Sequence, residues 1–198
     1  SLVRWAVAYD LLADHPAMAD FDAERATRTF LHTIYFHSYP LLESREPAAN
    51  NQHASMLLAQ AIIGYLFGIK RGHDPLARRL FEHAMHRYPE LIIHAEPGFA
   101  GEGSAYIDTV NVQILSFWLA FLRWLGEPVQ NHPFLQGLRT GQNLISPAGR
   151  TLPWDHYGSQ WALGISGLSL LSRITHDPVP LAILDHLNLW YGIDAGAW

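Results

Sequence analysis

Two long apolar segments constrain most strongly what this chain can fold into. They are "MLLAQAIIGYLFGI" (56–69) and "VQILSFWLAFLRWLG" (112–126). Each is hydrophobic around most of a helical wheel, so each needs neighbouring helices to cover it. Each is also too short for a transmembrane helix, or is interrupted by Gln or Arg. We therefore expect two core helices, and no membrane as a partner.

The rest of the chain also has helical periodicity, and no run shows the alternation of a strand. Pro40 should end the second helix. We expect helices at about 2–13, 20–38, 52–69, 75–87, 104–125, 133–140, 159–174 and 178–191.

Successive helices of this kind, joined as antiparallel pairs, predict an all-α fold. Both a helical bundle and part of an (α/α) toroid fit the pattern. The chain begins within a helical pattern, without an initiator Met or a signal peptide. We interpret 1–198 as a single helical domain taken from a longer protein.

Charge and composition exclude several classes of partner. The formal net charge is −5, so no basic field favours nucleic acid. There is no cysteine, which removes disulfides and thiolate metal sites. The segment "FEHAMHRYPELIIHAE" carries His83, His86 and His94, but no H-E-x-x-H pattern. We interpret these histidines as a solvated helix face and expect neither a metal nor another cofactor.

The glycine-rich turn "GFAGEGS" leads directly into the second apolar segment, and Tyr106 lies just inside it. Helical spacing places Tyr106, Thr109, Gln113 and Ser116 on one polar stripe. That stripe suggests a wet cavity, and the positive end of the helix dipole would favour a phenolate there. A capped core helix whose tyrosine hydroxyl makes an ordinary hydrogen bond explains the same residues.

A second group of polar residues lies at the start of the expected helix 52–69. The N-terminal end of this helix carries Asn50, Asn51 and His53, and Gln60 follows two turns later. An amide beside a neutral imidazole can bind and neutralise an anion. Asn51 is also a good N-cap, and that role alone accounts for it.

A third group lies in "TLPWDHYGSQWA", where Asp155, His156 and Tyr157 stand between Trp154 and Trp161. Aromatic side chains on either side of polar ones commonly stack on sugar rings, although they also anchor ordinary loops. Arg45 and Arg150 are the basic residues nearest to the proposed cleft.

Several segments together resemble helices of the heparinase II/III-like polysaccharide lyases, a group related to alginate and oligoalginate lyases. The E-G-x-x-Y pattern of Glu102–Tyr106 is the most specific element. The four segments are "RWAVAYDLL" (4–12), "NNQHASMLLAQAIIGYLFG" (50–68), "GEGSAYIDTVNVQILSFWLAFLRWLG" (101–126) and "LPWDHYGSQWALGISGL" (152–168).

This resemblance implies an incomplete (α/α) toroid, a following β-sandwich domain and a periplasmic or extracellular protein. It implies β-elimination of an acidic polysaccharide or oligosaccharide, with Tyr106 as general base and acid. Asn51 and His53 would neutralise the uronate carboxylate, or His53 would act as a second base. The expected substrate-binding residues are Asn50, Glu102, Gln113, Arg150, Trp154, Asp155, His156 and Tyr157.

Two alternatives remain open. An (α/α) glycoside hydrolase would use Glu102 and Asp155 as its paired carboxylates. A helical module without catalytic activity would bind carbohydrate or protein through its Trp-rich loops.

Overall fold

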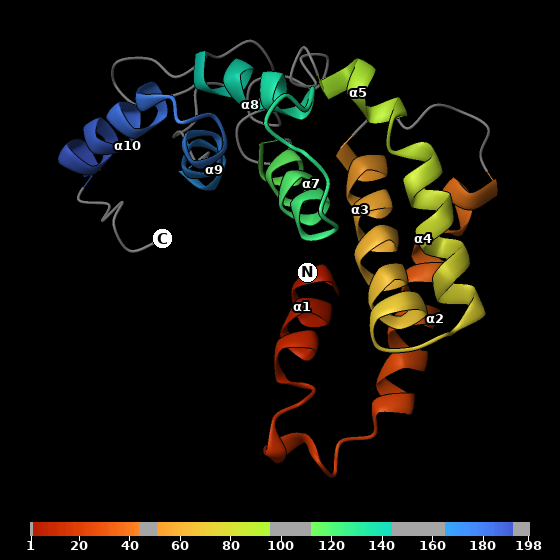
Figure 1. Ribbon diagram of the computed structural model, residues 1–198. Coiled ribbons are helices and arrows are strands. Elements are labelled where there is room, and N and C mark those ends of the chain that lie inside the picture. Colours follow the sequence, from red (N-terminus) through yellow and green to blue (C-terminus); the bar gives the residue numbers. More distant parts are fainter. Residues whose placement is uncertain (1, 44–50, 96–111, 144–164, 192–198) are drawn as a thin grey trace. The chain divides into compact units, whose positions relative to one another are not determined.

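The computed structural model describes residues 2–43, 51–95, 112–143 and 165–191 (Figure 1). These ranges contain helices and turns but no strand, so the predicted all-α class is confirmed for them. The helices are α1 Leu2–Leu12, η1 Pro16–Met18, α2 Ala23–Glu43, α3 Asn51–Tyr65, η2 Leu66–Lys70, α4 Pro75–Arg87, α5 Glu90–Ala95, α7 Val112–Trp124, α8 Phe134–Asn143, α9 Ile165–Thr175 and α10 Pro178–Tyr191.

The chain divides into two units, Ser1–Glu90 and Leu91–Trp198. In the first unit α3 is the central helix, and α1, α2 and α4 all pack against it (Figure 1). Its middle is buried on every side, as the apolar sequence predicts. The buried core around it consists of Ala6, Leu31, Ile34, Ala59, Ile63, Leu66, Phe67, Ala77 and Leu80.

Glycines bring the backbones of α3 and α4 into direct contact. A Cβ atom at Gly64 would lie 2.6 Å from the carbonyl oxygen of Ala77 and 2.6 Å from the amide nitrogen of Phe81. A Cβ atom at Gly68 would lie 2.5 Å from the amide nitrogen of Arg78. Only a residue without a side chain fits such approaches. The two helices therefore form one closely packed pair.

The predicted start of α4 is confirmed, and its chemistry is local. Asp74 is the N-cap, and its carboxylate accepts hydrogen bonds from the amides of Leu76 (2.8 Å) and Ala77 (3.0 Å). Pro75 follows as the first helical residue, where its missing N–H costs nothing. At the other end, the carboxylate of Glu90 accepts a 2.8 Å charged bond from Arg87.

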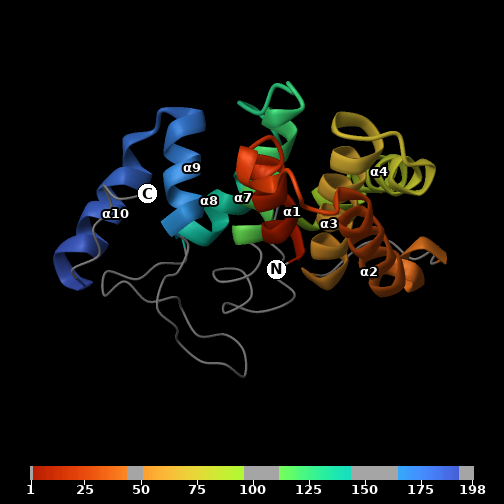
Figure 2. The ribbon, with the colours of Figure 1, turned by 90° about the horizontal axis from the view of Figure 1, so that it is seen from below.

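In the second unit, α7 packs against α8 and α9, and α9 packs against α10, which lies beside it in Figure 2. Trp118 of α7 and Phe134 of α8 are both fully buried, with ring centroids 6.4 Å apart. The other side of α7 carries Phe117 and Trp124, which are 43% and 42% exposed. The expectation that neighbouring helices cover the apolar side chains of this helix is thus wrong for these two residues.

Three expected boundaries are also wrong. α2 does not stop before Pro40 but continues to Glu43. Phe36, whose carbonyl a residue at position 40 would normally bond, is 71% exposed, so water can replace the missing N–H. The last turn of the expected helix 52–69 is π-helical, and the expected loop after α4 contains the short helix α5.

The α3–η2 run, Asn51–Lys70, is long and apolar enough to cross a membrane by length and composition alone. Of the most apolar 18-residue stretch of this run, 67% is buried inside the protein. A core helix satisfies the same criterion, and its packing against three neighbours accounts for this composition.

Candidate functional site

Most of the predicted site residues lie outside the described part of the chain. Gln113 is the second residue of α7, and its side chain is also outside that part. The residues outside the described ranges are Asn50, Glu102, Tyr106, Arg150, Trp154, Asp155, His156 and Tyr157.

Asn51 and His53 do lie within the described residues, in the first turn of α3, and both are half-buried. Asn51 is the first described residue of α3, close to the predicted N-cap position. The positive end of the helix dipole lies at this first turn and favours an anion there.

The two side chains do not point the same way. Residues two apart on a helix diverge by about 200°, because each residue turns the helix by about 100°. Asn51 shares its face with the exposed Ser55, whereas His53 shares its face with the buried Leu57 and Gln60. Both faces also carry buried residues further along α3, with Ala54 and Leu58 following Asn51 and with Leu57 and Gln60 following His53.

The structure shows a polar pair between α3 and α4 that the sequence did not predict. Gln60 is fully buried, and its Oε1 lies 2.7 Å from Nδ1 of His83. An amide oxygen can only accept, so Nδ1 of His83 carries the proton. Among the residues that the structure describes, none forms a hydrogen bond with the amide nitrogen of Gln60.

The interpretation of His83 as part of a solvated face is therefore wrong. Burial, followed by the positive charge of Arg87, lowers the pKa of His83 below its ordinary value of 6.5, although Glu90 opposes the shift. His83 is thus neutral near pH 7. The missed signal was Gln60 itself, because a polar residue inside an apolar helix needs a partner. Among the described residues, no three His, Asp or Glu side chains group as metal ligands.

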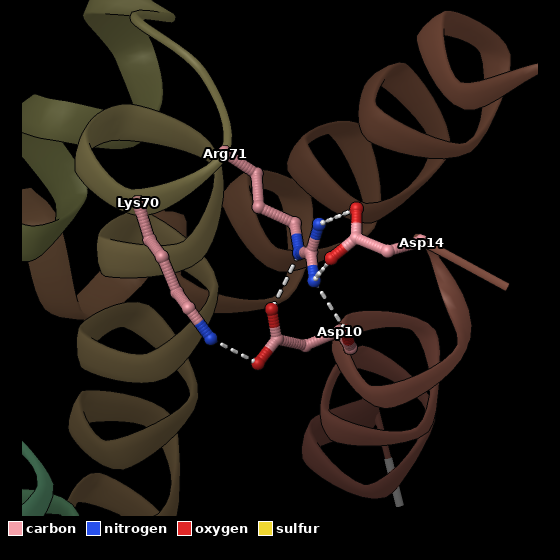
Figure 3. Close-up of polar contacts among 4 residues, drawn as sticks. All are labelled: Asp10, Asp14, Lys70 and Arg71. Carbon is pink, nitrogen blue, oxygen red and sulfur yellow. Dashed lines mark hydrogen bonds and ion pairs between the residues drawn. The ribbon is translucent and has the colours of Figure 1, made fainter.

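A second polar cluster joins α1 to the end of η2, as Figure 3 shows. The carboxylate of Asp10 accepts bonds of 2.5 Å from both Lys70 and Arg71. The guanidinium of Arg71 also donates two bonds of 2.9 Å to the carboxylate of Asp14 and one of 2.6 Å to the carbonyl oxygen of Asp10. All four charges in this ion cluster thus face an opposite charge.

The ion cluster holds its carboxyl groups in the charged form. Burial by itself would raise the pKa of Asp10, but the hydrogen bonds and charges of Lys70 and Arg71 outweigh it and lower that pKa. The hydrogen bond and charge of Arg71 likewise lower the pKa of Asp14. Neither carboxyl can exchange a proton near neutral pH, so the cluster is a structural contact and not an acid–base site.

The second unit contains a cavity of about 260 Å³ between the ends of α7 and α9. It shares no residue with any of the sites predicted from the sequence. Its lining combines two arginines and a histidine with one carboxylate and two apolar side chains. The lining residues are Arg123, Glu127, Val129, Gln130, Arg173, Ile174 and His176.

Comparison of the chain with known protein families, with curated proteins and with solved structures finds no significant match.

Proposed function

We propose that this protein is a polysaccharide lyase that cleaves a uronic-acid-containing glycan by β-elimination. The described helices would then form part of an (α/α) toroid that precedes a β-sandwich domain. The observation that carries the proposal is the amide–imidazole pair, Asn51 and His53, in the half-buried first turn of the core helix α3. The resemblance of the "NNQH" and E-G-x-x-Y segments to this family of lyases also supports the proposal.

The chemistry accounts for both residue types. A proton must leave the sugar carbon next to the carboxylate, and the negative charge of that carboxylate opposes its departure. Donors that bind the carboxylate stabilise the enolate-like intermediate. Tyr106 would take this proton and return one to the departing glycosidic oxygen, leaving an unsaturated sugar.

The geometry of α3 divides these roles. Asn51 is the first residue of α3, where its amide and the positive end of the helix dipole can both meet a carboxylate. His53 lies on the side that leads to Gln60, and its Nδ1 atom is buried. We therefore assign the direct contact with the carboxylate to Asn51. His53 supports that contact or serves as a second base.

The close packing of α3 against α4 suits this arrangement. The backbone contacts at Gly64, near the end of α3, and at Gly68 in η2 hold the C-terminal end of this helix closely against α4. A rigid helix keeps the first turn in one position, and pre-organised donors stabilise developing charge better than mobile ones.

The test is incubation of the full 198-residue chain with a panel of uronate polymers. Ultraviolet absorbance should rise as unsaturated ends form. Tyr106→Phe should abolish the rise and leave substrate binding nearly unchanged, whereas Tyr39→Phe, an exposed tyrosine on α2, should have no effect. Asn51→Ala should lower kcat by about 100-fold, the usual cost of losing one such donor.

Two other outcomes would contradict the proposal. New reducing ends without the absorbance change would indicate hydrolysis, with Glu102 and Asp155 as the carboxylates to test next. Binding without any product would indicate a carbohydrate-binding module. Normal turnover by Tyr106→Phe would show that another residue is the base.

A further inference from the structure

The cavity of the second unit lies where two helices end close together. Arg123 stands in the last turn of α7, and Arg173 stands in the last turn of α9. Val129 and Ile174, only 3% and 6% exposed, contribute apolar lining. A cavity of about 260 Å³ is slightly below the size of common ligand pockets, which start at about 300 Å³. It therefore suits a small ligand, about as large as one sugar ring.

The charges around the cavity favour an anion. The lining includes two guanidinium groups, Arg123 and Arg173, and one carboxylate, Glu127, so these three side chains together carry one net positive charge. Arg173 also interacts with another group of the protein. Its charge acts on the cavity whether or not that contact persists, because Coulomb interactions extend over several ångströms.

Arginines near helix C-termini often serve only to neutralise the helix dipole. At the end of α7, however, the backbone already satisfies its own carbonyls. The amide of Gly126 bonds the carbonyl of Arg123, and the amide of Glu127 bonds that of Leu122, each at 3.0 Å. Gly126 has a φ of 87°, which completes a Schellman turn. The side chain of Arg123 is not required to cap this helix.

The end of α9 is built differently. His176 adopts a left-handed backbone, with a φ of 57°, at a position where glycine would be the unstrained choice. Its amide donates a 2.8 Å bond to the carbonyl of Ser172. A histidine kept in this conformation places an imidazole on the cavity lining, where glycine would place nothing. Such residues recur at functional sites.

We propose that this cavity binds a small organic carboxylate about the size of a single sugar acid. The arginines pair with the carboxylate, and Val129 and Ile174 contact the apolar face of the ligand. Binding here is independent of any cleavage by Tyr106, since it uses only residues of α7, α9 and the turns that follow them.

The test is calorimetric titration of the full chain with glucuronate, glucose and inorganic phosphate. Glucuronate should bind at least ten times more tightly than glucose, which has the same ring without the charge. Equal binding of the two sugars would overturn the proposal. Phosphate as tight as glucuronate would also overturn it, because the site would then recognise charge without using its apolar lining.

Two single substitutions should change glucuronate binding in opposite directions, and a third is a control. Arg123→Gln should weaken glucuronate binding about tenfold, through loss of a charged hydrogen bond. Glu127→Gln should tighten it about twofold, because a repelling carboxylate is removed. Arg139→Gln, at an exposed arginine of α8 that does not line the cavity, is the matched control and should change nothing.

All three positions are exposed, so each variant should keep the fold. Glucuronate binding that survives Arg123→Gln unchanged would contradict the proposal. Weaker binding in Glu127→Gln would contradict it independently, because the two variants test charges of opposite sign.

Discussion

The core helix α3 and its continuation η2 meet their neighbours in two different ways. Along α4 the contact is between backbones, at Gly64 and Gly68, and the side chains of Gln60 and His83 are hydrogen-bonded across it. At the end of η2 the contact with α1 is ionic, through Lys70 and Arg71. The side chains of this ion cluster range from 11% exposed for Asp10 to 85% for Asp14.

The difference indicates what each contact can tolerate. Backbone atoms cannot move aside, so the α3–α4 contact depends on shape and is insensitive to salt. Charged side chains can rearrange, and water screens them, so the ion cluster depends on pH and ionic strength. Added salt should therefore weaken the ion cluster more than the α3–α4 contact.

The largest expected effect is at the backbone contact. Gly64→Ala should lower the free energy of unfolding by about 2 kcal/mol, as overpacking of a dense core does. The new Cβ atom would meet the Ala77 carbonyl and the Phe81 amide, which belong to the backbone of α4. Helix propensity alone predicts that Gly64→Ala raises the free energy of unfolding by about 1 kcal/mol. The sign of the change measured by urea denaturation therefore distinguishes overpacking from propensity.

Ser55→Ala, at an exposed position of the same helix, is the matched control for Gly64→Ala. It changes propensity without adding a buried atom and should leave the urea midpoint within error or slightly raised. Equal or greater stability of Gly64→Ala would show that α3 and α4 can separate by a few tenths of an ångström without cost.

The second effect is at the ion cluster. Asp10→Asn should lower the free energy of unfolding by about 1–2 kcal/mol, because it removes charged hydrogen bonds from a half-buried guanidinium. The loss should shrink in 1 M salt. Glu24→Gln is the control, since the Glu24–Arg28 pair is 80% and 69% exposed. Such surface pairs contribute about 0.5 kcal/mol or less. Equal losses in the two variants would show that burial adds nothing to the ion cluster.

Sequence periodicity predicted the all-α class and the positions of most described helices. Those predictions rest on local interactions, such as the Asp74–Pro75 start of α4 and the apolar stripe of each helix. The prediction that Pro40 ends α2 was wrong, because solvent exposure of the preceding turn outweighs the cost of a proline. Periodicity also failed at Phe117, since a helical wheel shows which residues are apolar but not how many neighbours cover them.

The polar contacts were less predictable than the helices. Asp10 and Arg71 are 61 positions apart, and Gln60 and His83 are 23 apart. Only the packing of α1, α3 and α4 brings either pair together. A buried glutamine signals that some partner exists, but local spacing cannot identify it. The positions of Asn51 and His53 in the first turn of α3 depend only on where this helix begins. Local sequence was therefore enough to predict them.

The smallest expected effect is the pH dependence of stability, which should differ between the α3–α4 contact and the ion cluster. The pKa of His83 lies below 6.5 in the folded protein, so the unfolded chain binds more protons as the pH falls through 6.5. Stability contributed by neutral His83 should therefore decline from about pH 6.5 downward. The pKa of Asp10 lies below 3.8, so its contribution persists to about pH 4 and is lost only as the pH falls through the folded value.

Urea titrations between pH 8 and pH 3 should show these as two separate declines. His83→Gln keeps a group that can bond Gln60 but does not titrate, so it should reduce the first decline and leave the second. Asp10→Asn should do the reverse. Ser55→Ala, at an exposed position of α3 that does not titrate, should change neither. A first decline that persists fully in His83→Gln would assign it to other histidines, among them His132, whose pKa burial also lowers. The α3–α4 contact would then be independent of pH as well as of salt.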